Sequence, residues 1–178
     1  MTGYKKTTEK NLMVFSGRAH PALAEEVAGI LGTDLPANAA EDSVNLLPVL
    51  RGEKVEKPLH DVVIHHSGSG HFAIRKGQWK LLLCRGSGGW SPPREAEAAK
   101  KKLPMLQLYD LANDPRETKN LQAKYPGKVA ELTNGLAKAI REGRTIPGPR
   151  QANQGWPNTI PKPIREKFPQ LAEPKIKS

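Results

Sequence analysis

Apolar residues gather in four short runs between residues 61 and 109, and each run predicts a β-strand. The runs are 61–66 (DVVIHH), 71–75 (HFAIR), 79–84 (WKLLLC) and 106–109 (LQLY). The first three follow one another across glycine-containing breaks of hairpin length, so they predict an antiparallel meander. The fourth comes after a long excursion, 85–104, and is expected to return to the same sheet.

A helical period replaces the strand period between residues 126 and 143. Apolar residues recur there at spacings of three and four, which predicts one buried helix face; they are Val129, Leu132, Leu136 and Ile140. Pro126 suits the first turn of this helix and Gly143 its end. Burial of the four side chains against a sheet contributes roughly 6–10 kcal/mol before the entropy of ordering is subtracted.

The segments before and after the predicted sheet and helix show other sequence patterns. Residues 11–15 (NLMVF) and 21–31 (PALAEEVAGIL) predict a short N-terminal strand–helix unit, and 33–58 predicts a surface connector. Prolines dominate residues 145–178, which predicts an extended, partly disordered tail. The fold class expected is α+β: a small antiparallel sheet of about four strands, packed by a C-terminal amphipathic helix.

Composition narrows the function classes. The chain has 178 residues with 28 Lys and Arg against 18 Asp and Glu, and the whole excess lies in residues 61–178. Aromatic residues do not interleave with these charges, so a solvated basic surface is favoured over a nucleic-acid groove. No apolar run reaches the roughly 18 residues of a membrane span, and no secretory signal is evident, which predicts a cytoplasmic protein. Cys84 is the single cysteine, so an internal disulfide is excluded.

Candidate chemistry concentrates in the segment His65-His66-Ser67-Gly68-Ser69-Gly70-His71, called here the histidine corner. Imidazoles and hydroxyls at a strand–turn–strand corner suit anion binding, proton transfer or a metal. Metal is the weakest option, because His65 and His66 are adjacent on a strand and point to opposite faces. One of the two is expected to pack inward and the other to project outward. The alternative is a plain Gly/Ser hairpin.

Two further motifs favour structural roles. The glycine-rich run 85–89 (RGSGG) resembles a phosphate cradle, but no GK[ST] follows it, so a flexible loop is the preferred interpretation. Asp110, Asp114 and Glu117 surround a turn and are expected to cap local N–H groups. The chain contains neither the GxSxG motif of nucleophilic hydrolases nor the HExxH motif of zinc proteases. No motif therefore supports membership of either enzyme class.

Residues 36–149 resemble the C-terminal region of the formylglycine-dependent, arylsulfatase-like sulfatases of the alkaline-phosphatase superfamily. The segments that carry the resemblance are LPANAAEDSVNLLPVLRG, VVIHHSGSGHFAIRKGQWKLLLC, Gly-Gly-Trp-Ser at 88–91, LPMLQLYDLANDPRETKNLQ and LAKAIREGRTIPGPRQAN. The resemblance implies an accessory subdomain that closes one side of a substrate cleft. It makes His65, His66, Ser67 and His71 the candidate substrate-binding residues, with no catalytic residue and no metal ligand in this chain.

The family's catalytic core does not appear in these residues. The resemblance implies a formylglycine nucleophile and a calcium ion in that core, yet Cys84 and Ser91 lack the surrounding motif and the aspartate–asparagine metal ligands are missing. A sulfated small molecule or glycan is therefore an expected partner only when a catalytic domain is present. No cofactor is expected in this chain, and it is expected to be inactive alone.

The first 35 residues resemble the N-terminus of ribose-phosphate pyrophosphokinase of an actinobacterial type, on MTGYKKTTEKNLMVFSGRAHPALAEEVAGILGT. The match ends near Ile30–Pro36, where a junction is expected. The predicted organisation is therefore 1–35, a pyrophosphokinase-like segment, 36–149, a sulfatase C-terminal subdomain, and 150–178, a Pro-rich tail. Two alternatives to the sulfatase reading remain open: a pyrophosphokinase fragment and a basic interaction protein.

Overall fold

The computed structural model describes residues 51–152 without a break and, beyond them, Asp42, Val44, Val49, Trp156, Pro157 and 159–173. The chain divides into two compact units, Met1–Leu59 and His60–Ser178. The strands and helices described below all belong to the second unit. The strand–helix unit expected in residues 1–35 lies outside the described residues, and the division at 35/36 and 149/150 stays a prediction.

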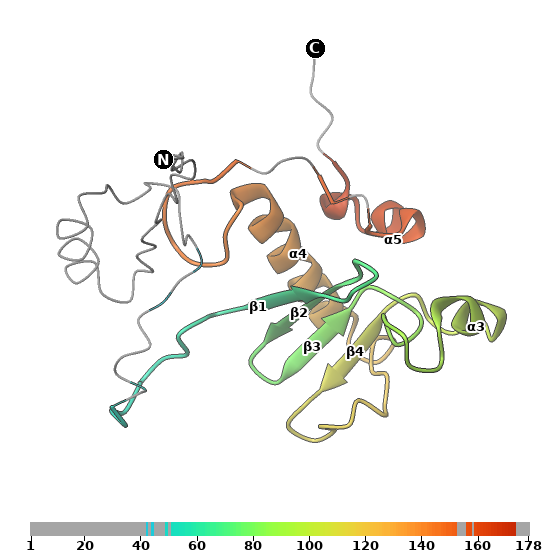
Figure 1. The fold of residues 1–178 in the computed structure, drawn as a ribbon, viewed down its shortest axis with the longest axis horizontal. Helices are drawn as coiled ribbons and strands as arrows, with labels where there is room; N and C mark the ends of the chain where they lie inside the picture. The colour runs from blue at the N-terminus through green and yellow to red at the C-terminus, as the bar shows by residue number, and fades with distance from the viewer. Residues whose placement is uncertain are drawn as a thin grey trace, which may run out of the picture. The chain divides into compact units, whose positions relative to one another are not determined.

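A four-stranded antiparallel sheet forms the centre of the second unit (Figure 1). Its strands run in chain order across the sheet, and each pairs with the next: β1 (Val63–His66), β2 (Phe72–Lys76), β3 (Trp79–Leu82) and β4 (Gln107–Asp110). The predicted meander is confirmed, and the fourth strand returns to the same sheet after the excursion. The α+β class is confirmed with it.

The pairing register gives the sheet two unlike faces, because directly paired residues project to the same side. One face is apolar and carries Ile64, Ile74, Leu81 and Leu108 across the strands. The other face, called here the polar face, carries two neighbouring rows. One row holds Val63, Arg75, Lys80 and Tyr109, and the next holds His65, Ala73, Leu82 and Gln107.

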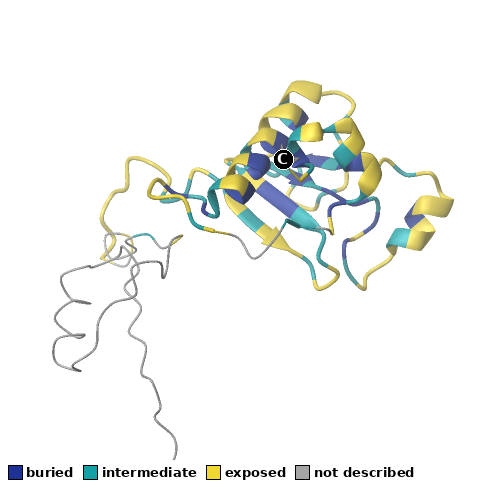
Figure 2. Ribbon diagram, turned by 90° about the horizontal axis from the view of Figure 1, so that it is seen from above, coloured by how far each residue is buried: buried dark blue, intermediate teal, exposed yellow. Residues whose placement is uncertain are grey.

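Helix α4 (Pro126–Glu142) covers the apolar face and contacts β2 and β3. The four residues of the predicted face, Val129, Leu132, Leu136 and Ile140, are all buried (Figure 2). Pro126 stands in the first turn, and Gly143 ends the helix in the left-handed region with φ 65°, as the sequence predicts. Among the described residues no helix is long and apolar enough to cross a membrane.

The Pro-rich tail differs from its prediction between residues 160 and 171. It contains helix α5 (Lys162–Lys167) and the 3₁₀ helix η1 (Pro169–Leu171), and it buries Ile160, Ile164 and Leu171 in the core. The expectation of an extended tail is therefore wrong here. The prolines stand in the first turns of these helices, where a missing N–H costs nothing, so they begin helices instead of breaking them.

The excursion between β3 and β4 also contains a helix that was not predicted, α3 (Glu95–Lys100). After β4, the chain folds back and closes that edge strand. Asn120 accepts the Leu108 N–H at 3.0 Å and donates to the Leu106 carbonyl at 2.9 Å, and the Leu121 N–H donates to the Leu108 carbonyl at 2.8 Å. The edge of β4 is thus saturated by the segment Asn120-Leu121.

Truncation of Leu136 tests the assigned face of α4. Leu136 is fully buried, whereas the Lys138 side chain on the same helix is 72% exposed. We expect Leu136→Ala to lower the free energy of unfolding by about 2–5 kcal/mol and the control Lys138→Ala to change it little. Urea denaturation measures both, and equal effects would show that the face is misassigned.

Truncation of Leu171 tests whether the C-terminal segment belongs to the core. Leu171→Ala empties a fully buried position, so we expect it to destabilise the chain by about 2–5 kcal/mol. The matched control is Glu166→Ala in α5, whose side chain is 64% exposed and is expected to contribute little. Thermal unfolding that is unchanged by Leu171→Ala contradicts the packing of this segment on α4.

Candidate functional site

The histidine corner is a tight turn between β1 and β2, closed by its own backbone. The Ser67 N–H donates to the His71 carbonyl at 3.0 Å, and the Gly70 N–H donates to the Ser67 carbonyl at 2.8 Å. The Ser67 hydroxyl oxygen accepts the His71 N–H at 3.3 Å. Ser67 and His71 are therefore brought together by the turn, and Ser67 acts first as its structural support.

Glycine is required at position 70 on two grounds. Its φ is +77°, and a Cβ there would lie 2.8 Å from the Thr159 Cγ2 atom. The C-terminal segment thus touches the corner through Thr159. On the other side, a Cβ on Gly88 would lie 3.8 Å from the Ser67 hydroxyl, so the loop after β3 also reaches the corner.

The two adjacent histidines diverge, as strand geometry requires, but both are exposed. His65 lies on the polar face, in the row of Gln107. His66 lies on the side of Phe72, whose ring it meets edge-on at 6.0 Å. The expectation that one of them packs inward is wrong, because β1 is an edge strand of the sheet and both side chains are exposed.

His71 is half-buried, unlike its two neighbours. Its Nδ1 atom is shielded and has no hydrogen-bond partner within the described part of the chain. The four predicted site residues therefore occupy three settings: the polar face for His65, the Phe72 side for His66, and the turn itself for Ser67 and His71. They form a corner that presents groups outward, not a pocket that converges on one point.

The polar face holds an ion pair that the sequence did not predict. The Lys80 Nζ donates to Glu117 Oε1 at 2.6 Å, and the two side chains are only 18% and 29% exposed. The pKa of His65 is lowered from its ordinary value. Partial burial is the larger cause, and the positive charge of Lys80 is the next. The lone lysine among the apolar residues of β3 was the available signal, but it did not reveal the partner 37 positions away.

Next to this pair lies a second polar network, around Gln107. Its Nε2 donates to the Cys84 carbonyl at 2.9 Å and to the Gly86 carbonyl at 2.7 Å, while its Oε1 accepts the Tyr109 hydroxyl at 2.7 Å. Burial raises the pKa of Tyr109 to about 12, with Glu117 adding to the shift. Gln107 therefore ties β4 to the loop that follows β3 through its amide nitrogen, while its amide oxygen holds Tyr109 of the same strand.

Cys84 is inert in this setting. It is 2% exposed, and its thiol points to the Gly86 carbonyl at 3.4 Å. Burial raises the pKa of the Cys84 thiol to about 11, and the Glu95 carboxylate adds to the shift. A thiol with this pKa carries little thiolate near neutral pH, so Cys84 fills space and does not act as a nucleophile.

The glycine-rich loop 85–89 already binds a carboxylate of the same chain, that of Glu95. The Glu95 carboxylate accepts the Arg85 N–H at 3.1 Å and the Gly86 N–H at 2.9 Å. Farther along, the Ser87 N–H donates to the Pro93 carbonyl at 2.9 Å. These N–H groups are occupied, which argues against a phosphate cradle. The expectation of a flexible loop is wrong as well, because these bonds cross-link it.

The carboxylates after β4 divide into two roles. Asp110 accepts the Ala112 N–H at 3.2 Å, and Asp114 accepts the Lys119 N–H at 2.8 Å, so capping is confirmed for both. Hydrogen bonds from the Thr118 and Lys119 backbones hold the pKa of Asp114 below its ordinary value. Glu117 differs from the prediction, since it pairs with Lys80 instead of capping the turn.

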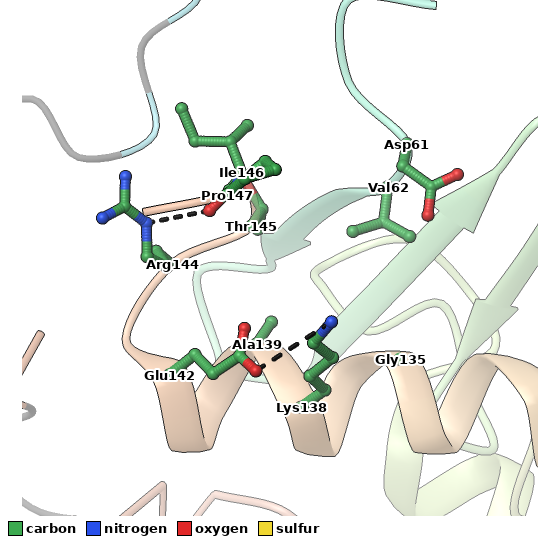
Figure 3. Close-up of a pocket in the computed structure, with 10 residues that line it drawn as sticks. All are labelled: Asp61, Val62, Gly135, Lys138, Ala139, Glu142, Arg144, Thr145, Ile146 and Pro147. Atoms are coloured by element: carbon green, nitrogen blue, oxygen red, sulfur yellow. Dashed lines mark hydrogen bonds and ion pairs between the residues drawn. The ribbon is translucent and has the colours of Figure 1, made fainter. Parts of the chain in front are cut away.

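A separate cavity of about 260 Å³ lies beside the C-terminal half of α4 (Figure 3). Its lining includes Lys138 and Glu142, whose charges pair at 3.9 Å, and the buried Arg144. Arg144 donates from Nε to the Ile146 carbonyl at 2.8 Å and from Nη1 to the Pro149 carbonyl at 2.7 Å. This arginine holds the turn after α4, and no predicted site residue lines the cavity.

Metal binding finds no support in the side-chain arrangement. Within the described ranges, no group of three or more His, Cys, Asp or Glu side chains is placed to hold a metal ion. The calcium ion implied by the sulfatase resemblance therefore has no fitting site among these residues.

Thiol reactivity tests the environment of Cys84. Because the pKa of Cys84 is raised from 9.0 to about 11, the native chain is expected to react with DTNB at pH 8 on the order of 100-fold more slowly than the chain unfolded in guanidinium. The raised pKa also means that burial of the neutral Cys84 thiol stops contributing to the free energy of unfolding as pH rises from about 9 to 11. Equal rates in the native and unfolded chains contradict the buried thiol.

Comparison with known proteins gives two separate similarities. The chain is 31% identical over 110 residues to an N-acetylgalactosamine-6-O-sulfatase of Bacteroides thetaiotaomicron, which covers 62% of this chain and 21% of the relative. It is 58% identical over 45 residues to the ribose-phosphate pyrophosphokinase of Streptomyces avermitilis, which covers 25% of this chain and 14% of that enzyme. No protein-family model matches the chain.

Solved structures include sulfatases as well. One, from work on the metabolism of multiple glycosaminoglycans by Bacteroides thetaiotaomicron, is 29% identical, with a TM-score of 0.45 over 66% of this chain and 24% of its own. Another, a 2-O GAG sulfatase, is 27% identical, with a TM-score of 0.38 over 66% and 23%. The chain spans about a fifth of the length of the curated sulfatase and about a seventh of the pyrophosphokinase. The chain is thus a sulfatase homologue over 62% of its length, preceded by a short N-terminal segment similar to ribose-phosphate pyrophosphokinase.

Proposed function

We propose that the sheet and helix of the second unit serve as a C-terminal subdomain of a sulfatase that forms one wall of the substrate cleft. The observation that supports this is the 31% identity over 110 residues to an N-acetylgalactosamine-6-O-sulfatase. The wall supplies binding groups, and a catalytic domain supplies the nucleophile and the calcium ion. By themselves these 178 residues do not hydrolyse sulfate esters.

The histidine corner is the part of this wall that meets the substrate. Its imidazoles are exposed, and its turn is fixed by backbone hydrogen bonds. An imidazole N–H donates well to a sulfate oxygen, and a rigid turn loses little entropy when it does so. His66 is the residue assigned to the substrate, whereas His65 lies on the opposite face beside Lys80 and Glu117.

The proposed ligand is a sulfated sugar, which the wall contacts weakly by itself and which is held firmly only when the catalytic domain completes the pocket. The relative's name places the sulfate on N-acetylgalactosamine, and this sugar is the first one to test. The basic balance of residues 61–178 favours an anionic ligand in general. This charge does not distinguish one sulfated position of the sugar from another. Specific contacts at the corner therefore determine which sulfate ester is bound.

Absence of turnover by the isolated chain is the first test. We expect no hydrolysis of an aryl sulfate, with or without calcium and formylglycine-generating enzyme, because the described residues offer no activated nucleophile and no group placed to stabilise the transferring sulfuryl group or the leaving phenolate. The assay uses an intact sulfatase as its positive control. Turnover above background that disappears with Cys84→Ala or Ser91→Ala would falsify the proposal.

A graft tests the role of the corner. A complete sulfatase is made with residues 60–173 of this chain in place of its own C-terminal region. In that enzyme we expect His66→Ala to raise KM or lower kcat/KM roughly tenfold, with metal content unchanged.

The matched control is His65→Ala, one position away and on the other face, for which we expect KM to stay within about twofold. If neither variant, or both variants equally, alter the kinetics of the grafted enzyme, His66 does not contact the substrate and the plain hairpin interpretation replaces the cleft wall.

A further inference from the structure

Trp90 is the most exposed large hydrophobic side chain among the described residues, with 82% of its surface accessible. The chain has three tryptophans, and the other two have structural partners. Trp79 packs edge-on against Tyr125 at 5.1 Å, and the Trp156 Nε1 donates to the Leu171 carbonyl at 3.0 Å. Folding of the second unit therefore explains two tryptophans and leaves the third without a packing role.

The exposure of Trp90 is fixed by its loop. Before it, the Arg85 and Gly86 N–H groups bind the Glu95 carboxylate, and a Cβ on Gly86 would lie 2.5 Å from the Pro93 carbonyl oxygen. Around it, the Ser87 hydroxyl donates to the Ser91 carbonyl at 2.6 Å. Hydrogen bonds thus join the two arms of the loop on both sides of Trp90. The backbone that carries the exposed ring is therefore ordered before a ligand binds.

The ring stands beside the histidine corner. A Cβ on Gly68 would lie 3.5 Å from Cη2 and 3.7 Å from Cζ2 of Trp90, so the edge of its six-membered ring lies next to Gly68 in the turn. The same loop supplies a cation, since the exposed Arg94 donates from Nε to the Trp90 carbonyl at 3.4 Å. The loop after β3 therefore presents an exposed indole next to Gly68 of the turn and an exposed guanidinium bonded to the Trp90 carbonyl.

We propose that Trp90 is a stacking platform for the pyranose ring of the sulfated sugar, with the sulfate directed to the Ser67–Gly70 turn. This inference rests on the proposed function and assigns the sugar contact that it lacks. A pyranose presents an apolar C–H face, which suits the negative π-face of an indole, and its sulfate suits the adjacent guanidinium. Tryptophan is also one of the residue types enriched among the contacts that carry most of the binding energy.

Titration of the full chain followed by amide and indole N–H signals in NMR tests the platform. The probes are N-acetylgalactosamine 6-sulfate, unsulfated N-acetylgalactosamine and inorganic sulfate. We expect the sulfated sugar to shift both the Trp90 indole signal and the amides of the turn, and inorganic sulfate to shift the turn alone. Trp90→Ala is expected to weaken binding of the sulfated sugar by roughly tenfold, and Trp90→Phe to weaken it less.

Val63→Ala is the matched control, because Val63 is 50% exposed and lies at the opposite end of β1 from the corner. It removes exposed apolar surface without touching the loop, so binding is expected to stay unchanged. Melting temperatures within a degree or two of the parent chain show that each variant is folded.

The outcomes separate the platform from the function on which it rests. Sulfated sugar that shifts the turn amides with equal affinity in the parent chain and in Trp90→Ala overturns the platform and leaves the proposed function standing. Unsulfated sugar that shifts the indole as strongly as the sulfated one, with the turn unmoved, supports the platform and removes the role of the corner in sulfate recognition. No shift with either sugar at tens of millimolar overturns the platform.

Discussion

Burial of helix α4 from two sides is the interaction on which the rest of the described unit depends. The sheet covers one side through Ile74 and Leu81, and the C-terminal segment covers another through Leu171. Between helix and segment, the buried Thr133 hydroxyl donates to the Val129 carbonyl at 2.9 Å and accepts the Gln170 amide at 3.2 Å. The segment packed in this way carries Thr159 against Gly70, so the helix core indirectly fixes the position of the histidine corner.

The second constraint is electrostatic and local. The Glu95 carboxylate lies over the N–H groups of Arg85 and Gly86, and Gln107 bridges the carbonyls of Cys84 and Gly86. A loop with several glycines has much backbone entropy to lose, and these bonds offset that loss before any ligand arrives. A ligand that contacts Trp90 or the corner therefore meets groups already in place, which is the condition for useful affinity from a small contact area.

Periodicity predicted the sheet and the main helix because both elements follow local rules. Apolar runs separated by glycine-containing breaks placed the strands, and spacings of three and four placed the buried face of α4 with Leu136 on it. The Lys80–Glu117 pair and the burial of Ile160 escaped prediction, since both depend on contacts between distant segments. The exposure of both His65 and His66 escaped for a related reason: alternation predicts opposite faces, but only the tertiary fold shows that β1 is an edge.

The groups gathered at the corner are suited to binding and unsuited to bond cleavage. Cys84 is buried with a pKa of about 11, and the Ser67 hydroxyl is engaged in holding the turn, so neither is an activated nucleophile. Contacts that hold a sugar equally in the bound state and in the transition state act on KM and leave kcat nearly unchanged. A wall of this kind therefore decides which sugar is held against the catalytic domain, while the rate of sulfate release is set by groups outside it. In the proposed cleft wall, recognition and chemistry fall on separate parts of a complete enzyme, so the described residues of the second unit need only present binding groups on a defined surface.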